Sequence, residues 1–197
     1  MAGSLSETRD YTALLSYLEP ETLRPISRVE YDRMVALGLF EDERVELLHG
    51  VLVTMSPQGP AHNEVIDRLN ELLVPALLGR ARVRIQGAFA ASEDSQPEPD
   101  VAVFPRDNYG AAHPTHALLV IEVSESSLGK DRGIKKALYA TAGVPEYWIV
   151  NLEDRVVEVY THPANGTYAD ADIKGPQDTL SPLAFSDISL HVAELLP

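Results

Sequence analysis

The spacing of apolar residues along the chain predicts a protein of mixed helices and strands. Apolar positions three and four residues apart indicate helices over residues 28–37, 61–78 and 130–142. Alternating or continuously apolar runs indicate strands. The predicted strands are residues 44–48, 51–55, 82–86, 89–91, 101–104, 118–123, 145–150 and 155–160. This order favours an α/β or α+β fold, in which helices flank a mixed central sheet.

Short-range signals mark the ends of several elements. Ser27 and Glu30 have the spacing of a capping box at a helix start. His49-Gly50 separates two apolar runs and predicts a hairpin turn. Pro75 is expected to kink or shorten the second helix, and Gly143 to close the third.

The two ends of the chain show weaker patterns. Residues 1–24 have no clear period, apart from a short helical stretch at 13–18, and we expect an N-terminal extension there. Residues 161–197 are rich in turn-forming residues. The run 118–123 is the most continuously apolar strand, so we place it centrally in the sheet.

Composition narrows the class of protein. The chain has 197 residues, of which 45% are hydrophobic and 23% charged, as in an ordinary globular protein. It has no cysteine, which excludes a disulfide framework and a thiolate metal site. We find no signal peptide and no apolar run of the roughly 18 residues that span a membrane. We therefore expect a cytoplasmic protein that does not enter membranes.

The net charge of −14 limits the ways in which nucleic acid could be bound. Proteins that bind phosphates tightly usually present a basic face. The acidic balance argues against a non-specific, high-affinity nucleic-acid binder. It leaves room for a local basic groove, or for a cation that bridges protein and phosphate.

Two carboxylates are the candidates for chemistry. Asp100 opens a strand-like run, and Glu122 lies within the most apolar one. Asp100 could be a turn carboxylate, and Glu122 could pair with Lys or Arg or lie on a wet strand edge. A buried carboxylate is costly unless it is paired or bound to a cation. Our hypothesis is that both bind Mg²⁺ or Mn²⁺, together with a backbone carbonyl, for which we choose Val123, and water.

A lysine pair follows on the third predicted helix. Lys135 lies one turn before Tyr139, on the helix that begins after the Glu122 strand. An ammonium group there could orient a water molecule or stabilise developing negative charge. The alternative for either lysine is a solvated helix face, which we prefer for Lys136.

Together these residues resemble a known family. The motifs are Arg44-x-Glu46-Leu47-x-x-Gly50, Met55-Ser56-Pro57 with His62, Pro99-Asp100, Glu122-Val123-Ser124, Asp131-x-x-x-Lys135-x-x-x-Tyr139 and Gly143-Val144-Pro145-Glu146-Tyr147-Trp148-Ile149-Val150. Over residues 25–162 the chain resembles the Uma-two-type endonuclease family, a bacterial branch of the PD-(D/E)XK, restriction-endonuclease-like superfamily.

The resemblance implies a single nuclease-like domain over residues 25–197 and a Mg²⁺-dependent site that cleaves DNA. By position, Asp100 and Glu122 are the motif carboxylates. Ser124 stands where the superfamily lysine would fall, which makes Lys135 the functional substitute. Glu46 matches an acidic residue that the family carries upstream. Its role would be that of a further metal ligand or of a group that holds a metal-bound water. The alternative is a strand carboxylate that faces solvent. The family also suggests a homodimer.

Other readings of these residues stay open. His62 could reach the site, although we slightly favour a core histidine beside Ile66. Tyr139, Tyr147 and Trp148 are expected to pack in the core. The rival functions are a non-catalytic interaction module with a nuclease fold, which Ser124 and the acidic charge favour, and a hydrolase of a small phosphodiester.

Overall fold

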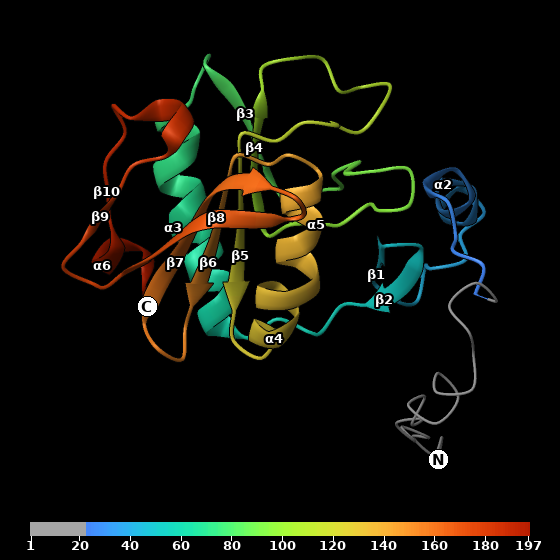
Figure 1. The fold of residues 1–197 in the computed structure, drawn as a ribbon, viewed down its shortest axis with the longest axis horizontal. Coiled ribbons are helices and arrows are strands. Elements are labelled where there is room, and N and C mark those ends of the chain that lie inside the picture. The colour runs from blue at the N-terminus through green and yellow to red at the C-terminus, as the bar shows by residue number, and fades with distance from the viewer. Residues whose placement is uncertain (1–22) are drawn as a thin grey trace.

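The computed structural model describes residues 23–197, and its centre is a six-stranded mixed sheet (Figure 1). Strands β5 and β6 run parallel, and every other neighbouring pair is antiparallel. In spatial order the strands are β3 (Ala81–Ile85), β4 (Val101–Pro105), β5 (Leu119–Ser124), β6 (Glu146–Asn151), β7 (Val156–Ala164) and β8 (Thr167–Lys174). The predicted mixed sheet and the inner position of β5 are confirmed.

Helices cover both faces of this sheet (Figure 1). Helix α3 (Pro60–Ala76) buries Val65, Leu69 and Leu73 against one face, and ends one residue after Pro75. Helix α5 (Lys136–Thr141) packs Leu138 and Tyr139 against the other face. Because successive side chains of a strand point to opposite faces, β4 and β5 supply residues to both layers.

The helical segment after β5 is not the single α-helix that the sequence predicts. It begins as α4 (Leu128–Lys130), continues as the π-helix η2 (Asp131–Lys135) and ends as α5. This segment crosses from β5 to the parallel strand β6. A π-helix is rare and is frequently found at functional sites.

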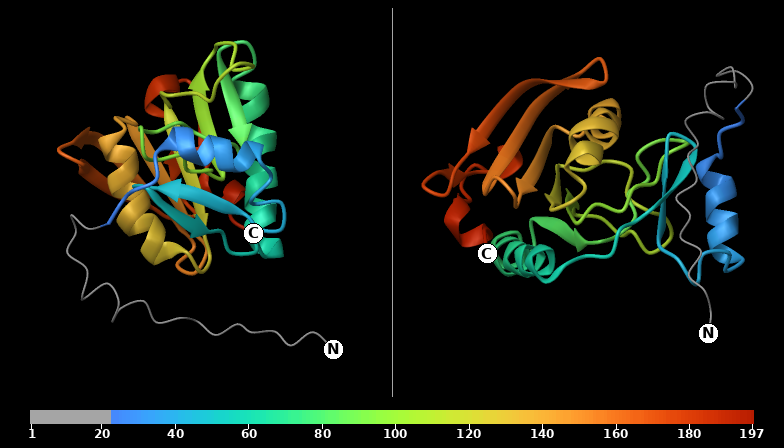
Figure 2. Two further views of the ribbon diagram at one scale, coloured as in Figure 1. Left: turned by 90° about the vertical axis from the view of Figure 1, so that its right-hand side faces the viewer. Right: turned by 90° about the horizontal axis from the view of Figure 1, so that it is seen from below.

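A small arm lies to one side of the sheet (Figure 2). It consists of α2 (Arg28–Ala36) and the hairpin of β1 (Val45–Leu48) and β2 (Val51–Thr54). The predicted capping box and the predicted hairpin turn are both present, and His49 and Gly50 have positive φ angles. The arm joins the rest through backbone bonds to residues 93–96.

Two predictions about chain segments are wrong. Residues 89–91 form no strand of the sheet, because Phe89 and Ala90 donate their backbone N–H groups to Pro97 and Pro114 in neighbouring loops. The turn-rich region 161–197 contains more regular structure than predicted. It holds the end of β7, β8, β9 (Thr179–Leu180), η3 (Leu183–Phe185), β10 (Leu190–His191) and α6 (Val192–Leu195).

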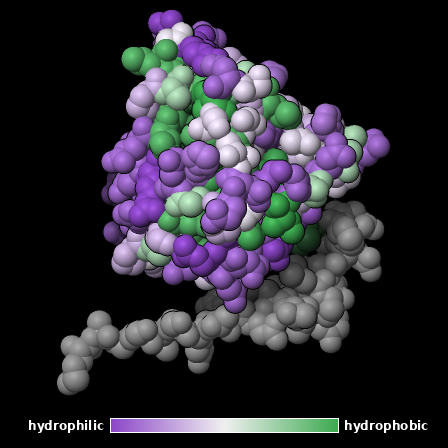
Figure 3. Space-filling model, turned by 90° about the vertical axis from the view of Figure 1, so that its left-hand side faces the viewer, coloured by the Kyte–Doolittle hydropathy of each residue, from purple (hydrophilic) through white to green (hydrophobic). Residues whose placement is uncertain are grey.

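The surface is mostly polar. On the face shown in Figure 3, hydrophobic residues form separate patches between hydrophilic ones. No helix in residues 23–197 is long and apolar enough to cross a membrane. The extension over residues 1–24 and its short helix lie almost wholly outside the described residues, and the division at residue 25 stays a prediction.

Candidate functional site

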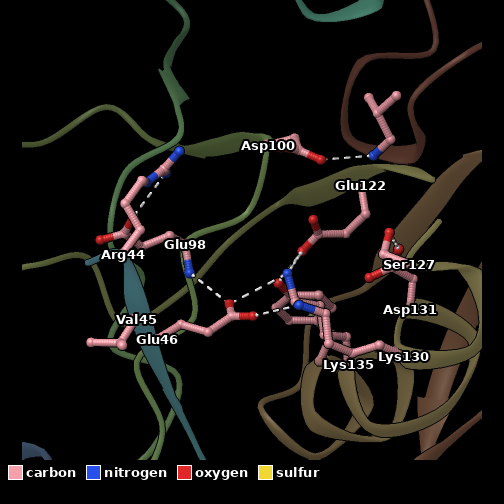
Figure 4. Close-up of polar contacts among 12 residues, drawn as sticks. Arg44, Val45, Glu46, Glu98, Asp100, Glu122, Ser127, Lys130, Asp131 and Lys135 are labelled. Atoms are coloured by element: carbon pink, nitrogen blue, oxygen red, sulfur yellow. Dashed lines mark hydrogen bonds and ion pairs between the residues drawn. The ribbon is translucent and has the colours of Figure 1, made fainter. Parts of the chain in front are cut away.

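The two predicted carboxylates lie side by side at one end of the sheet. Asp100 immediately precedes β4, and Glu122 is near the end of β5, so the antiparallel pairing of these strands brings them together. The backbone N–H of Val123 donates to Asp100 Oδ2 at 2.9 Å (Figure 4). Both carboxylates line one cleft, although both residues are almost fully buried.

Neutral and basic donors surround Asp100. His62 Nε2 lies 3.1 Å from Asp100 Oδ2, and Gln58 Nε2 donates to Asp100 Oδ1 at 3.3 Å. Burial alone would raise the pKa of Asp100, but the bonds from His62 and Val123 outweigh it and lower the pKa. His62 is therefore a neighbour of the candidate site, rather than the core histidine that we slightly favoured.

Only one of the two carboxylate oxygens of Glu122 accepts hydrogen bonds from residues 23–197. Its Oε1 accepts bonds from Lys135 Nζ at 2.9 Å and from the Tyr139 hydroxyl at 2.6 Å. Its Oε2 accepts no hydrogen bond from residues 23–197. Burial raises the pKa of Glu122, and the Lys135 ammonium opposes that rise. The buried ion pair that we gave as an alternative for Glu122 is thus present, but it uses only one of the two carboxylate oxygens.

Lys135 connects two carboxylates. Its Nζ lies 2.9 Å from Glu122 Oε1 and 3.4 Å from Glu46 Oε2. Burial would lower the pKa of Lys135, but these two carboxylates outweigh it and raise the pKa, so the amine stays charged. Lys136 points elsewhere, with its ammonium 4.8 Å from the centre of the Tyr160 ring.

Glu46 is fully buried in β1, which rules out the alternative of a solvent-facing carboxylate. Lys130 Nζ donates to its Oε1 at 3.1 Å, and the Glu98 backbone N–H donates to its Oε2 at 3.4 Å (Figure 4). Glu46 therefore ties the arm to both ends of the π-helical turn.

Ser124 stands where the lysine of the superfamily would fall, and its side chain bonds Asp131 and neither of the two candidate carboxylates. Its hydroxyl donates to Asp131 Oδ2 at 2.6 Å, and Ser127 donates to the same oxygen. Both serines therefore hold the first residue of the π-helix, while the last residue, Lys135, brings an ammonium to Glu122.

The donor set suits a hard cation bound largely through water. Among residues 23–197, no group of three or more His, Asp or Glu side chains is placed to hold a metal ion. Mg²⁺, however, keeps several waters and is commonly bound by one or two carboxylates plus substrate phosphates. The unbonded Oε2 of Glu122 and the carboxylate of Asp100 border the same cleft, so these residues fit Mg²⁺ or Mn²⁺.

Sequence reasoning missed several residues of this cluster. Gln58 and Lys130 carry no motif signal of their own. Asp131 shares a motif with Lys135 and Tyr139, but the sequence indicates no role for it. Tyr139 was expected to pack, and it does, but its hydroxyl also bonds Glu122. Burial and Glu122 raise the pKa of Tyr139, so this hydroxyl stays protonated.

Comparison with known proteins agrees with the motifs. A crystal structure of "a putative nuclease belonging to DUF820" from Anabaena variabilis has a TM-score of 0.68 and 19% identity, covering 87% of this chain and 97% of that chain. At this identity the likeness establishes the fold alone. None of the curated proteins matches this chain. A family model described as "Uma2: Putative restriction endonuclease" matches residues 28–193. The chain therefore belongs to the Uma2 family of restriction-endonuclease-like proteins.

Proposed function

We propose that this protein is a divalent-metal-dependent endonuclease that hydrolyses phosphodiester bonds of DNA. One observation carries the proposal: Asp100 and Glu122 meet at one cleft, with a lysine ammonium 2.9 Å from Glu122. Carboxylates can hold a metal ion that assists phosphodiester hydrolysis, and an ammonium can stabilise the negative charge that develops. Family membership supports the same reaction.

Asp100 and Glu122 are the residues that would hold Mg²⁺ or Mn²⁺. We propose the carbonyl of Val123 as a third oxygen, since Val123 also lines the cleft. The bound ion supplies neutralisation of phosphate charge and activation of water. His62 and Gln58 position the Asp100 carboxylate through their hydrogen bonds.

Lys135 keeps one donor for the substrate. An ammonium group has three N–H donors. Glu122 accepts one of them at 2.9 Å, and Glu46 lies within ion-pair distance at 3.4 Å. Lys135 borders the cleft, so its third N–H can reach the attacking water or a phosphate oxygen.

Glu46 is a positioning residue in this proposal. Its carboxylate is already shared by Lys130 and Lys135, which leaves no unbonded oxygen for a metal ion. It fixes the Lys135 ammonium beside Glu122. The accessory role predicted for Glu46 is thus proposed to act through the lysine.

The test combines metal titration with DNA cleavage. We expect calorimetry to show Mn²⁺ binding to the native protein and none to the Asp100→Asn variant. Supercoiled plasmid should be nicked by the native protein in Mg²⁺ or Mn²⁺, and not by the variant. Glu146→Gln, which alters a buried carboxylate of β6 outside the cleft, should leave both properties unchanged.

Three outcomes would contradict or narrow the proposal. A protein that binds neither ion and cleaves nothing would favour the interaction module. Hydrolysis of a chromogenic diester without plasmid cleavage would favour the small-substrate hydrolase. Equal activity of Lys135→Ala and the native protein would remove the lysine from the mechanism. The homodimer stays a prediction.

A further inference from the structure

A stretch of the chain without acidic residues leads away from the cleft along β3. Residues 72–92 contain three arginines and no Asp or Glu, although the whole chain has 30 acidic residues and 16 Lys and Arg. β3 pairs only with β4 and is therefore an edge strand. Arg82 and Arg84 are two positions apart on it, so their side chains leave the same face.

Arg80, the first arginine of this stretch, is paired with Asp187, but Arg82 and Arg84 are not neutralised by a carboxylate of residues 23–197. Arg82 donates to the backbone carbonyl of Asp107, Arg84 to that of Ala88, and Arg106, just after β4, to that of Gly79. None of the three forms an ion pair with a carboxylate of residues 23–197. Arg82 and Arg106 are exposed to solvent. We call Arg82, Arg84 and Arg106 the arginine edge.

The arginine edge borders a hollow in the surface. Arg82 and Arg106 line an open hollow of about 540 Å³ at the start of β3, with Leu77 and Leu78 at the end of α3 on its apolar side. Arg84 lies over the rings of Phe104 and Tyr109, at 5.6 and 5.7 Å from their centres. Positive charge is therefore presented along a recessed edge of an otherwise acidic molecule.

The same strand leads directly to the candidate site. The Gln86 backbone N–H donates to the Asp100 carbonyl at 3.0 Å. The Gln86 side chain donates to Gln58 at 2.7 Å, and Gln58 donates to Asp100. A strand rises about 3.3 Å per residue, so Arg84 and Arg82 lie roughly 7 and 13 Å beyond Gln86.

We propose that the arginine edge binds the phosphate backbone of the DNA strand that is cleaved at the cleft. This inference rests on the proposed function, because it takes DNA as the substrate. Charged residues can also simply prevent edge-to-edge pairing of strands, but residues of either sign do that. Three arginines without a carboxylate partner in residues 23–197, in a chain of net charge −14, favour an anionic polymer.

The test measures DNA binding separately from cleavage. All proteins carry Asp100→Asn, and their affinity for a fluorescent DNA duplex is measured at several salt concentrations. Each lost phosphate contact lowers the salt slope by about 1, so Arg82→Gln with Arg106→Gln should lower it by about 2. Between 50 and 200 mM salt, the parent should lose roughly tenfold more affinity than this double variant.

A matched control removes the same charge from elsewhere. Arg155 lies in the turn after β6, and Lys174 ends β8, the opposite edge strand. Arg155→Gln with Lys174→Gln also removes two positive charges. It should keep the salt slope and affinity of the parent.

The outcomes separate this inference from the proposed function. An unchanged salt slope in the arginine variant, with plasmid cleavage by the native protein intact, overturns the inference alone. The same holds if the variant alters only self-association in sedimentation, since β3 would then pair with a second copy. A protein that fails to bind DNA but hydrolyses a small diester also overturns it. DNA binding that depends on the arginines, without any hydrolysis, supports phosphate binding at the arginine edge but refutes the proposed function and, with it, the link to a cleaved strand.

Discussion

Two buried glutamates on the parallel pair β5 and β6 show how differently the same side chain can be used. Glu122 on β5 has one oxygen shared by Lys135 and Tyr139, while the other borders the cleft unbonded. Glu146 on β6 has both oxygens occupied by neutral donors. Trp148 Nε1 donates to one at 2.8 Å, and the Leu183 backbone N–H donates to the other at 2.7 Å.

The comparison separates a structural carboxylate from a candidate catalytic one. Glu146 fixes the C-terminal segment at Leu183 to the sheet, and its bonding capacity is used within the fold. Glu122 is held by an ammonium and a hydroxyl, and it keeps an oxygen for something outside the protein. Both residues are buried, so burial alone does not tell a structural carboxylate from a candidate catalytic one. The unbonded oxygen at a cleft is the informative difference.

The largest expected effect concerns activity. Glu122→Gln removes the charge that we propose binds the metal ion, and should lower kcat/KM on a chromogenic phosphodiester at least about 100-fold. Glu146→Gln should retain kcat/KM close to the native value. If the two variants lose activity equally, the comparison fails.

The next effect concerns stability at the cleft. Lys135→Met leaves Glu122 buried without its ammonium partner, although Glu46 keeps its bond from Lys130, and should cost about 3–5 kcal/mol in the free energy of unfolding. Lys136→Met is the neighbouring control and should lose only the contact with Tyr160, about 0.5–1 kcal/mol. Urea denaturation at pH 7 measures both. Equal losses would mean that the buried ion pair of Lys135 contributes no more to stability than the contact of Lys136 with Tyr160.

A smaller loss is expected at Glu146. In Glu146→Gln an amide N–H₂ replaces one oxygen, so a donor faces either the Trp148 or the Leu183 donor. Leaving a buried donor unsatisfied should lower the free energy of unfolding by about 1–3 kcal/mol. Urea denaturation measures this change. An unchanged midpoint would show that Glu146 does not hold the C-terminal segment.

The smallest effect is a pH dependence at the same residue. Burial raises the pKa of Glu146 above its usual 4.5, although the bonds from Leu183 and Trp148 oppose this rise. A carboxyl group with a higher pKa in the folded state stabilises the fold fully below its unfolded pKa, and that stabilisation is lost as pH rises through the folded pKa. The stability difference between the native protein and Glu146→Gln should thus be larger at pH 4.5 than at pH 7. A difference that grows toward pH 7 would contradict the assignment.

Periodicity predicted the central part of the fold because burial and pattern agree there. β4, β5 and β6 are mostly apolar and buried along nearly all their length, and α3 has a regular apolar stripe. The meeting of Asp100 and Glu122 was also predictable, since two apolar strands joined by a loop tend to pair.

The remaining features depend on contacts that local sequence does not encode. β8 is mostly exposed and polar, and it forms by pairing with β7. Glu46 resembles any strand carboxylate until Lys130, 84 positions later in the chain, is placed beside it. Phe89 is fully buried in a loop, so its apolar side chain gave a false strand signal.

The π-helical turn from Asp131 to Lys135 makes the site sensitive to the number of residues as well as to their identity. Lys130 and Lys135 both reach Glu46 from the two ends of this turn. Deleting Gly133 would close it to an ordinary α-helical turn and rotate Lys130 by about 100° relative to Lys135. A lineage that lost this one codon would retain every charged residue of the site, yet its two ammonium groups would no longer converge on a shared partner.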